Sequence, residues 1–348
     1  MHPEKATITL LLVCLIIALP TLSEGRVTGI CSDCHTMHFS QDGDSSAFDV
    51  TSPQQSLLNT TCIGCHSSTD DTTIDTSMGG ATPIVFNNGT APATPLSGGN
   101  FYWVKATDDR MGHNVIDTSA AADATLGVTP PGGTILDGTR MSCAGTTGCH
   151  GDRTIVGSGK SGGSDTAAVS GAHHTAGTTV DGSTVGKSYR FLYGITGTED
   201  SDWEYTKSST DHNVYQGANR SDDDSTLSAA EQTTVSSLCA QCHTNFHNGD
   251  TDPVDGSVWG TPWVRHPTDF DMSTDLNSPN IEYPTTYNTD IPIAYSDVST
   301  KTDEIVMCIS CHRAHGSPNE SILRWDYRGW PADTSFTNGC SICHTDKD

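Results

Sequence analysis

Aliphatic and cationic side chains are both scarce in this 348-residue sequence. Leu, Ile, Val and Phe supply 50 of the 323 residues after residue 25, about 15%, and 42 acidic residues face only 17 Lys and Arg, giving a net charge of −25. Chains with less than about 20% of these apolar residues and a high net charge are ordinarily disordered. The acidity also excludes the basic stripe of a nucleic-acid-binding protein. The chain therefore predicts no conventional hydrophobic core, and something bound to it must supply one.

Long apolar runs are equally rare. The single run covers residues 6–19, follows Lys5 and leads into a small-residue stretch ending at Gly25. This pattern predicts a secretory signal peptide over residues 1–25. No later run approaches the length of about 20 residues that a membrane helix needs, so we expect no membrane span in the mature chain. We expect a secreted protein, extracellular or on the outer cell surface, with the periplasm as the alternative.

Cysteine, in contrast, is abundant and regularly placed. One of the thirteen cysteines, Cys14, lies in the signal segment, and the other twelve form six pairs, each ending in Cys-His. Five pairs have the spacing Cys-x-x-Cys-His, and the sixth, from Cys143 to His150, has five residues between its cysteines. The paired cysteines are Cys31 and Cys34, Cys62 and Cys65, Cys143 and Cys149, Cys239 and Cys242, Cys308 and Cys311, and Cys340 and Cys343.

The Cys-x-x-Cys-His pattern is the attachment site of c-type haem. The two thiols form thioethers with the porphyrin, and the adjoining histidine becomes an axial ligand of the iron. Twelve cysteines then predict six covalently attached haem c groups with none left over. The predicted proximal ligands are His35, His66, His150, His243, His312 and His344.

Other uses of paired cysteines explain the pattern less well. Zinc sites do not require histidine after every second cysteine, and a disulfide framework needs no histidine at all. Thioredoxin-like pairs occur singly on an α/β pattern that is absent here. For the stretched motif, a disulfide between Cys143 and Cys149 remains the alternative.

Six bis-histidine haems need six further histidines, and the mature chain offers eight. The distal candidates are His38, His113, His174, His212, His247, His266 and His315, with His174 preferred to its neighbour His173. A histidine three or four residues after a proximal ligand shares its helix face, so it cannot reach the far side of the same iron. It can reach the iron of a neighbouring haem. Methionine is the rival ligand, with Met37, Met111, Met141 and Met307 near motifs or candidate ligands.

Catalysis at a haem would require an iron with an open position, often marked by a motif ending in lysine. The sequence contains no Cys-x-x-Cys-Lys. Full histidine ligation therefore favours an electron carrier over an enzyme. A terminal reductase of metal ions remains an alternative function.

The expected fold is a mostly irregular, loop-rich chain with few short helices and minor β structure, folded around haems. A capping box at Ser228 predicts the clearest helix, over Ser228–Cys242. Short strands are expected at Pro83–Asn87, Asn100–Val104 and Tyr189–Tyr193. We expect one hexahaem unit over residues 26–348, made of a two-haem part (26–80), a haem-poor segment (81–142) and a four-haem part (143–348).

Several passages resemble a family of secreted multihaem cytochromes from metal-reducing bacteria. They are Cys31–His38, Ser188–Leu192, Trp263–Pro267, Cys308–Pro318 and Leu323–Tyr327. The stretched motif at Cys143 departs from the family pattern. Some relatives, the hexahaem outer-surface cytochromes, polymerise into extracellular filaments in which a histidine of one subunit ligates a haem of the next.

This resemblance implies long-range extracellular electron transfer through closely spaced haems in a head-to-tail homopolymer. An upstream cytochrome or outer-membrane conduit would donate electrons, and an extracellular acceptor would receive them. His38, near the mature N-terminus, or failing that another motif-adjacent histidine, is the expected histidine of the joint. The alternative function is a soluble monomeric electron shuttle.

Overall fold

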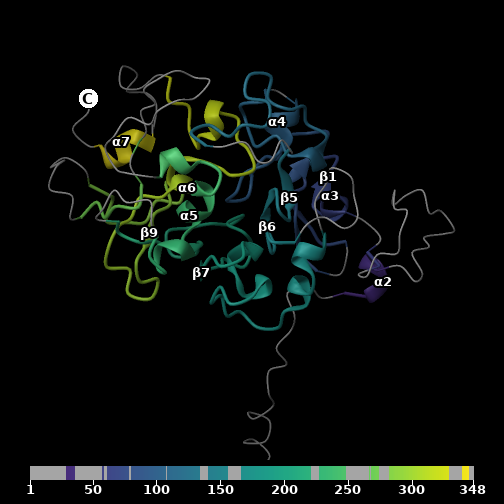
Figure 1. Cartoon of the computed structure of the whole chain (residues 1–348), viewed down its shortest axis with the longest axis horizontal. Helices are drawn as coiled ribbons and strands as arrows, with labels where there is room; N and C mark the ends of the chain where they lie inside the picture. Colours follow the sequence, from purple (N-terminus) through teal and green to yellow (C-terminus); the bar gives the residue numbers. More distant parts are fainter. Residues whose placement is uncertain are drawn as a thin grey trace, which may run out of the picture.

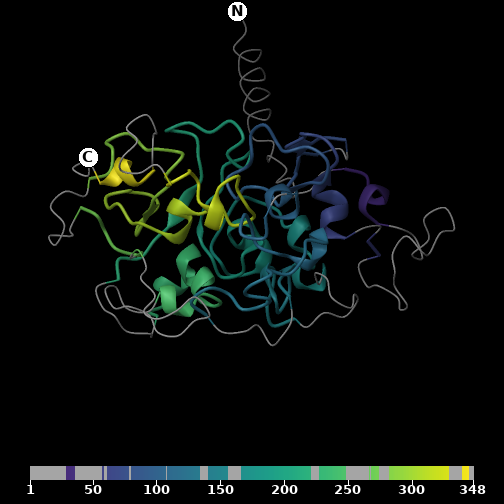
Figure 2. The same ribbon diagram turned by 90° about the horizontal axis from the view of Figure 1, so that it is seen from above.

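The structure is a computed structural model. It describes residues 29–35, 57–58, 61–77, 80–106, 108–133, 140–155, 166–220, 227–247, 266, 268–273, 282–328 and 339–344. The signal segment and His38 lie outside these residues. Figures 1 and 2 show the N-terminal part of the described chain at one end of the molecule and the C-terminal part at the other.

Regular structure is short and scattered, as the sequence predicts. The α-helices are α2 (Cys31–Cys34), α3 (Cys62–Cys65), α4 (Tyr102–Ala106), α5 (Val235–Ala240), α6 (Cys308–Cys311) and α7 (Gly339–Cys343). Single turns of 3₁₀ helix are η3 (Ile116–Thr118), η4 (Thr166–Val169), η5 (Ala172–His174), η6 (Val185–Lys187), η7 (Tyr189–Phe191), η8 (Glu231–Thr233), η9 (Thr244–Phe246) and η10 (Glu320–Ile322). Most of the α-helices coincide with cysteine motifs.

The β structure consists of small separate ladders. The strands are β1 (Ser67–Ser68), β2 (Ile74–Asp75), β3 (Thr82–Pro83), β4 (Phe86–Asn87), β5 (Ser142–Ala144), β6 (Gly148–His150), β7 (Gly197–Thr198), β8 (Val214–Gln216) and β9 (Ala294–Tyr295). Strands β1 and β4 pair in parallel, and so do β5 and β6, whereas β2 and β3 pair antiparallel. Strand β8 lies between β7 and β9 in the one three-stranded sheet among the described residues. The loop-rich fold class is confirmed.

Among the described residues, buried apolar side chains form three small clusters instead of one extensive core. The first surrounds the three-stranded sheet and contains Tyr189, Ile195, Tyr215, Val235, Leu238, Ala294, Ile305 and Met307. The second contains Val214, Met272, Tyr283, Ile291, Ile293, Tyr295 and Val306. The third, near the N-terminal end, contains Phe86, Phe101, Val104, Val115 and Ala120.

Two of the expected strands are wrong. Residues 102–106 form helix α4, because the side chain of Asn100 accepts a hydrogen bond from the backbone N–H of Tyr102 (2.9 Å) and so starts a turn. Residues 189–191 form η7, with Arg190 in a left-handed conformation (φ +48°). The Arg190 N–H donates to Glu199 (2.5 Å), and these tertiary bonds override the strand preference of an aromatic-rich segment. At 83–87 only the short β3 and β4 form.

The expected capping box is confirmed, but its helix is broken. The Ser228 N–H donates to the Glu231 carboxylate (2.5 Å), and the Glu231 N–H donates to the Ser228 hydroxyl (3.4 Å). Only η8 follows directly, because Thr234 is extended and begins α5 anew with a side-chain cap on the Ser237 N–H.

In the part of the chain that the structure describes, no helix is long and apolar enough to cross a membrane.

Candidate haem-binding sites

Each Cys-x-x-Cys-His motif folds as one helical turn. The backbone N–H of the histidine donates to the carbonyl of the first cysteine, at 2.8 Å for His35, 2.9 Å for His66, His243 and His344, and 3.1 Å for His312. Residues i, i+3 and i+4 share one face of such a turn. The turn therefore presents both sulfurs and the imidazole on the same side, as attachment to one porphyrin requires.

The stretched motif uses a different device. Cys143 lies on β5 and Cys149 on β6, which run side by side in parallel and are joined through Gly145 at φ +90°. A side chain at Gly148 would collide with the backbone of Ala144, so the close approach requires glycine there. Neither Cys143 nor Cys149 takes part in a disulfide among the described residues.

Five proximal histidines each face a second histidine ring. The pairs and the distances between ring centroids are His35–His174 at 6.1 Å, His66–His173 at 6.4 Å, His150–His315 at 6.3 Å, His113–His243 at 6.2 Å and His266–His344 at 6.1 Å. The centroid distances lie in a narrow range although the partner histidines come from unrelated loops. The interplanar angles, in contrast, vary from 18° to 73°.

These distances fit one metal ion between two imidazoles. With metal–nitrogen bonds of about 2 Å and a ring nitrogen roughly 1.1 Å from the ring centre, two such rings have centroids about 6.2 Å apart. Direct ring stacking would bring the centroids much closer, as in the His212–Tyr287 stack at 3.6 Å. The pairs therefore match the axial ligation of haem iron, in which each ring is free to turn about its bond to the metal.

Backbone carbonyls fix the orientation of the rings. The Nδ1 atoms of His66, His150, His243 and His312 lie 2.8, 2.9, 2.7 and 2.9 Å from the carbonyl oxygens of Pro83, Arg190, Pro131 and Ser321. In His113 the Nδ1 atom lies 2.5 Å from the Ala314 carbonyl. A proton held on Nδ1 leaves the lone pair of Nε2 for a metal, which is the usual outer-sphere arrangement of ligating histidine.

Burial keeps these imidazoles neutral. Desolvation lowers the pKa of His66, His113, His150 and His312, and it lowers the pKa of His243 to about 4 and of His315 to about 3. An unprotonated ring is the form that binds iron, so at neutral pH no proton has to leave before ligation.

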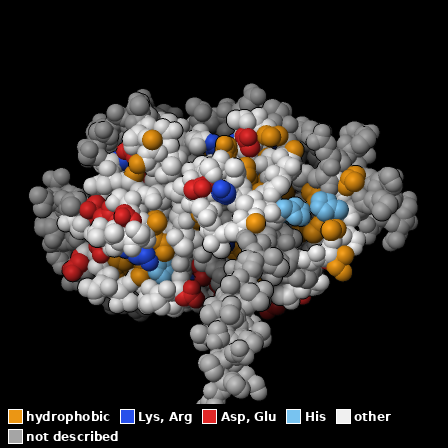
Figure 3. Space-filling model, turned by 90° about the horizontal axis from the view of Figure 1, so that it is seen from below, with side chains coloured by type: hydrophobic (Ala, Val, Ile, Leu, Met, Phe, Trp, Pro, Cys, Tyr) orange, Lys and Arg blue, Asp and Glu red, His pale blue; other side chains and the backbone are white. Residues whose placement is uncertain are grey.

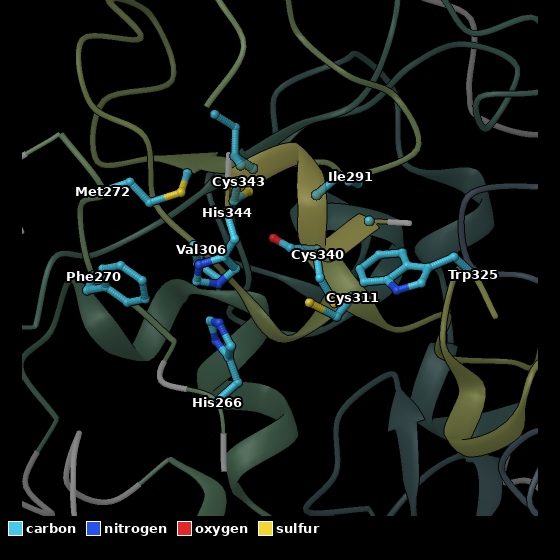
Figure 4. Close-up of a pocket in the computed structure, with 13 residues that line it drawn as sticks. His266, Phe270, Met272, Ile291, Val306, Cys311, Trp325, Cys340, Cys343 and His344 are labelled. Atoms are coloured by element: carbon cyan, nitrogen blue, oxygen red, sulfur yellow. The ribbon is translucent and has the colours of Figure 1, made fainter. Parts of the chain in front are cut away.

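One pair lines an apolar cavity. In Figure 4 the rings of His266 and His344 point toward one another, with Cys340 and Cys343 beside them and Phe270 opposite. The remaining lining residues are Met272, Ile291, Ile293, Val306, Ser310, Cys311, Trp325 and Gly339. The cavity thus combines a thioether-forming pair, two facing imidazoles and an apolar wall.

At the opposite end, the first motif lies near the surface. Ile30 is 72% exposed and His174 is exposed, whereas His35 is partly buried. Figure 3 shows histidine side chains among hydrophobic ones on the side of the molecule that carries α2. A porphyrin attached here would be accessible from outside the subunit.

His312 differs from the other proximal histidines. Its ring is oriented by the Ser321 carbonyl, but no second histidine ring faces it among the residues that the structure describes. His38, the candidate nearest to the N-terminus, falls outside those residues.

Two distal candidates are engaged elsewhere. The Nε2 atom of His247 lies 2.5 Å from the Asp269 carboxylate, and both side chains are buried. The His212 ring stacks on Tyr287 with an interplanar angle of 7°. Neither is brought against a proximal histidine.

Consecutive motifs lie near enough in space for their side chains to interact. Burial, followed by the charge of Cys34, raises the pKa of the Cys65 thiol. The thiols of Cys239 and Cys308 are hydrogen-bonded to each other. Electrostatic contact joins consecutive motifs through the pairs Cys34 and Cys65, His66 and His150, Cys149 and Cys242, Cys239 and Cys308, and Cys311 and Cys340. The backbone N–H of Cys308 also donates to the Ser236 hydroxyl (3.3 Å), linking α6 to α5.

These features define a c-type cytochrome that carries several covalently attached haems. The chain is related by sequence to the C-type cytochrome OmcS of Geobacter sulfurreducens, with 26% identity over 379 residues covering 91% of this chain and 83% of OmcS. A family model described as a doubled CXXCH motif matches residues 301–348, which contain the last two motifs. The relation to a cytochrome agrees with an electron carrier rather than an enzyme.

Two solved structures of the same relative are similar to the chain. The outer membrane cytochrome S filament from Geobacter sulfurreducens is 20% identical, with a TM-score of 0.42 over 87% of this chain and 85% of that one. The OmcS nanowires from the same organism, solved by cryo-EM, are 21% identical, with a TM-score of 0.40 over 86% and 84%.

Proposed function

We propose that the protein conducts electrons along a row of six bis-histidine haems. The observation that carries this proposal is the set of five histidine pairs whose ring centroids are 6.1–6.4 Å apart. The proposed proximal ligands are the six motif histidines. The proposed distal ligands, in the order of the motifs, are His174, His173, His315, His113, His38 of another subunit, and His266. His212 and His247 are left out because Tyr287 and Asp269 engage them.

The protein supplies spacing and ligation, and bound haem iron supplies the change between its ferric and ferrous states. The adjacent residues His173 and His174 face the proximal ligands of the first two motifs, which favours two irons close together. The segment from His312 to His315 likewise serves two motifs. Because the motifs lie near one another, electrons would pass between neighbouring haems through the subunit.

The six haems would form one unit over residues 26–348. Support comes from the haem-poor segment 81–142, which packs against the C-terminal part. Gly99 and Gly112 each form a β-bridge with Gly316, and the His113 ring is held by the Ala314 carbonyl. The segment therefore supplies a distal ligand and a scaffold for haems that are attached elsewhere in the chain.

His312, which faces no second histidine ring among the described residues, supports assembly into a filament. Five proximal histidines face a second histidine of the same chain, and among the unused distal candidates His38 lies nearest to the predicted mature N-terminus. A short terminal segment can be donated to a neighbour at little cost in chain entropy. A head-to-tail joint of this kind is heterologous and propagates as an open filament unless it closes a ring. OmcS, the relative in sequence, has been solved as a filament.

We place this filament outside the cell, in line with the predicted signal peptide. Its donor would be an upstream cytochrome or an outer-membrane conduit, and its acceptor an extracellular oxidant. The net charge of −25 suits soluble export and a cationic or metal-ion acceptor.

Electron microscopy of the secreted protein, together with the variants His38→Ala and His212→Ala, tests the proposal. Wild type and His212→Ala should form filaments with all haems low-spin. His38→Ala should yield monomers in which one haem lacks its second histidine. Wild-type material that is monomeric would favour the soluble shuttle, and His38→Ala filaments with every haem low-spin would move the joint away from His38.

A further inference from the structure

Two arginines lie beside the motif of Cys308 and Cys311. Arg313 directly follows His312, and its N–H donates to the Ile322 carbonyl (2.8 Å). Arg324 lies across the same short ladder, where its N–H donates to the Cys311 carbonyl (2.8 Å). The ladder therefore fixes both arginine backbones against the segment that carries the proximal histidine.

The two guanidinium groups converge on one carbonyl. Nη1 of Arg313 donates to the carbonyls of Leu96 (3.0 Å) and Ser97 (3.2 Å). Nη2 of Arg324 reaches the same Ser97 oxygen at 3.5 Å, and its Nε donates to the Ile309 carbonyl (2.7 Å). Carbonyl oxygens satisfy donors, but they do not neutralise charge.

No carboxylate oxygen of a described residue lies within 4.0 Å of either guanidinium. Asp290 and Glu204 act on Arg313 only at longer range, and the Asp290 carboxylate is taken by Lys207 (2.8 Å). Two like charges removed from water normally require an anion close by.

One donor is left over. Nη1 of Arg324 is buried and has no hydrogen-bond partner in the described part of the chain. Buried charged donors without partners are costly, so their occurrence calls for an acceptor. Because the whole chain has only 17 Lys and Arg against 42 acidic residues, two half-buried arginines beside one motif are a specific feature.

We propose that Arg324, supported by Arg313, binds a propionate carboxylate of the haem attached at Cys308 and Cys311. This inference rests on the proposed function, because it requires a haem at that motif. Guanidinium and carboxylate are matched in shape and charge, and a two-pronged pair would use the free Nη1. The pair would hold the porphyrin in place at the haem whose second ligand comes from another subunit. Arg324 is thus a positioning residue, and its charge would favour the reduced state of this haem.

Arg324→Gln in the full-length secreted protein is the test, with Arg328→Gln as the control. Arg328 is exposed and paired with Asp326, so the control removes the same charge from the surface of the same segment. Both proteins would be produced with ¹³C in the haem propionate carboxyls. Redox titration followed by optical and infrared difference spectroscopy then reports potential and propionate environment together.

In Arg324→Gln, about a sixth of the absorbance change should move to lower potential, and one ¹³C carboxylate band should shift. Arg328→Gln should match wild type in both measurements. Arg324→Lys should largely restore the potential but still alter the band, because an ammonium group cannot form the two-pronged pair. Unchanged bands and potentials in an Arg324→Gln protein with all its haems would overturn the proposal.

Intact mass separates this inference from the proposed function. A wild-type protein without haem at Cys308 and Cys311 would refute the six-haem arrangement itself. If Arg324→Gln is not secreted with its full haem content, Arg324→Lys decides, and a Lys variant whose carboxylate band equals that of wild type would refute propionate binding alone.

Discussion

The rings of His150 and His315 face each other at 6.3 Å, although they come from opposite halves of the chain. His315 follows His312 by three residues, so one short segment carries the proposed proximal ligand of one motif and faces the proposed proximal ligand of another. The Gly98 carbonyl accepts the His315 N–H (2.7 Å) and fixes this segment. A haem bound by His150 and one bound by His312 must consequently be close neighbours.

Replacing His315 should open one haem. In His315→Ala the haem attached through His150 loses its distal ligand, so we expect about a sixth of the iron to become high-spin and to bind carbon monoxide after reduction. Electron paramagnetic resonance and carbon monoxide titration measure both effects. His212→Ala removes a non-motif histidine that stacks on Tyr287 and should leave all haems low-spin. If the two variants have the same spectra, His315 is not a ligand.

The stretched motif should carry one haem. Intact mass of the mature protein should exceed the polypeptide mass by six haems, and Cys143→Ser combined with Cys149→Ser should remove one. The same pair of changes at Cys62 and Cys65 is the matched control and should also remove one haem. A wild-type mass with five haems and an oxidised Cys143–Cys149 pair would instead establish the disulfide.

The sequence predicted the loop-rich fold with few short helices, because that follows from composition. It could not assign distal ligands, because His113 and His266 meet their partners only through tertiary folding. The preference for His174 over His173 treated the doublet as one site, yet each ring faces a different proximal histidine. The sequence offered eight candidate histidines for six distal positions. That count allowed both His173 and His174 to be ligands, each for a different iron.

The small apolar clusters should matter for stability despite the expected dominance of haem. Ile305 is fully buried beside Ala294, and the two residues exchange backbone hydrogen bonds of 2.9 Å. Ile305→Ala should lower the free energy of unfolding by about 2–5 kcal/mol, since it leaves a cavity in packed surroundings. Ile30→Ala, at a position 72% exposed, should change it by less than about 0.5 kcal/mol. Denaturant titration followed by circular dichroism would measure both, and equal midpoints would show that the first cluster contributes little.

Mixing variants should reveal the polarity of the proposed filament. A subunit with His38→Ala keeps the haem that accepts a histidine but cannot donate one, so it can join one end of a growing filament and not the other. Once joined, it presents no donor and stops growth there, because a heterologous joint needs unlike surfaces. Coexpression of wild type with rising fractions of His38→Ala should therefore shorten the filaments progressively, and electron microscopy measures their lengths. Coexpression with His212→Ala should leave the lengths unchanged. Filaments that stay long in the presence of abundant His38→Ala would place the joint at another residue.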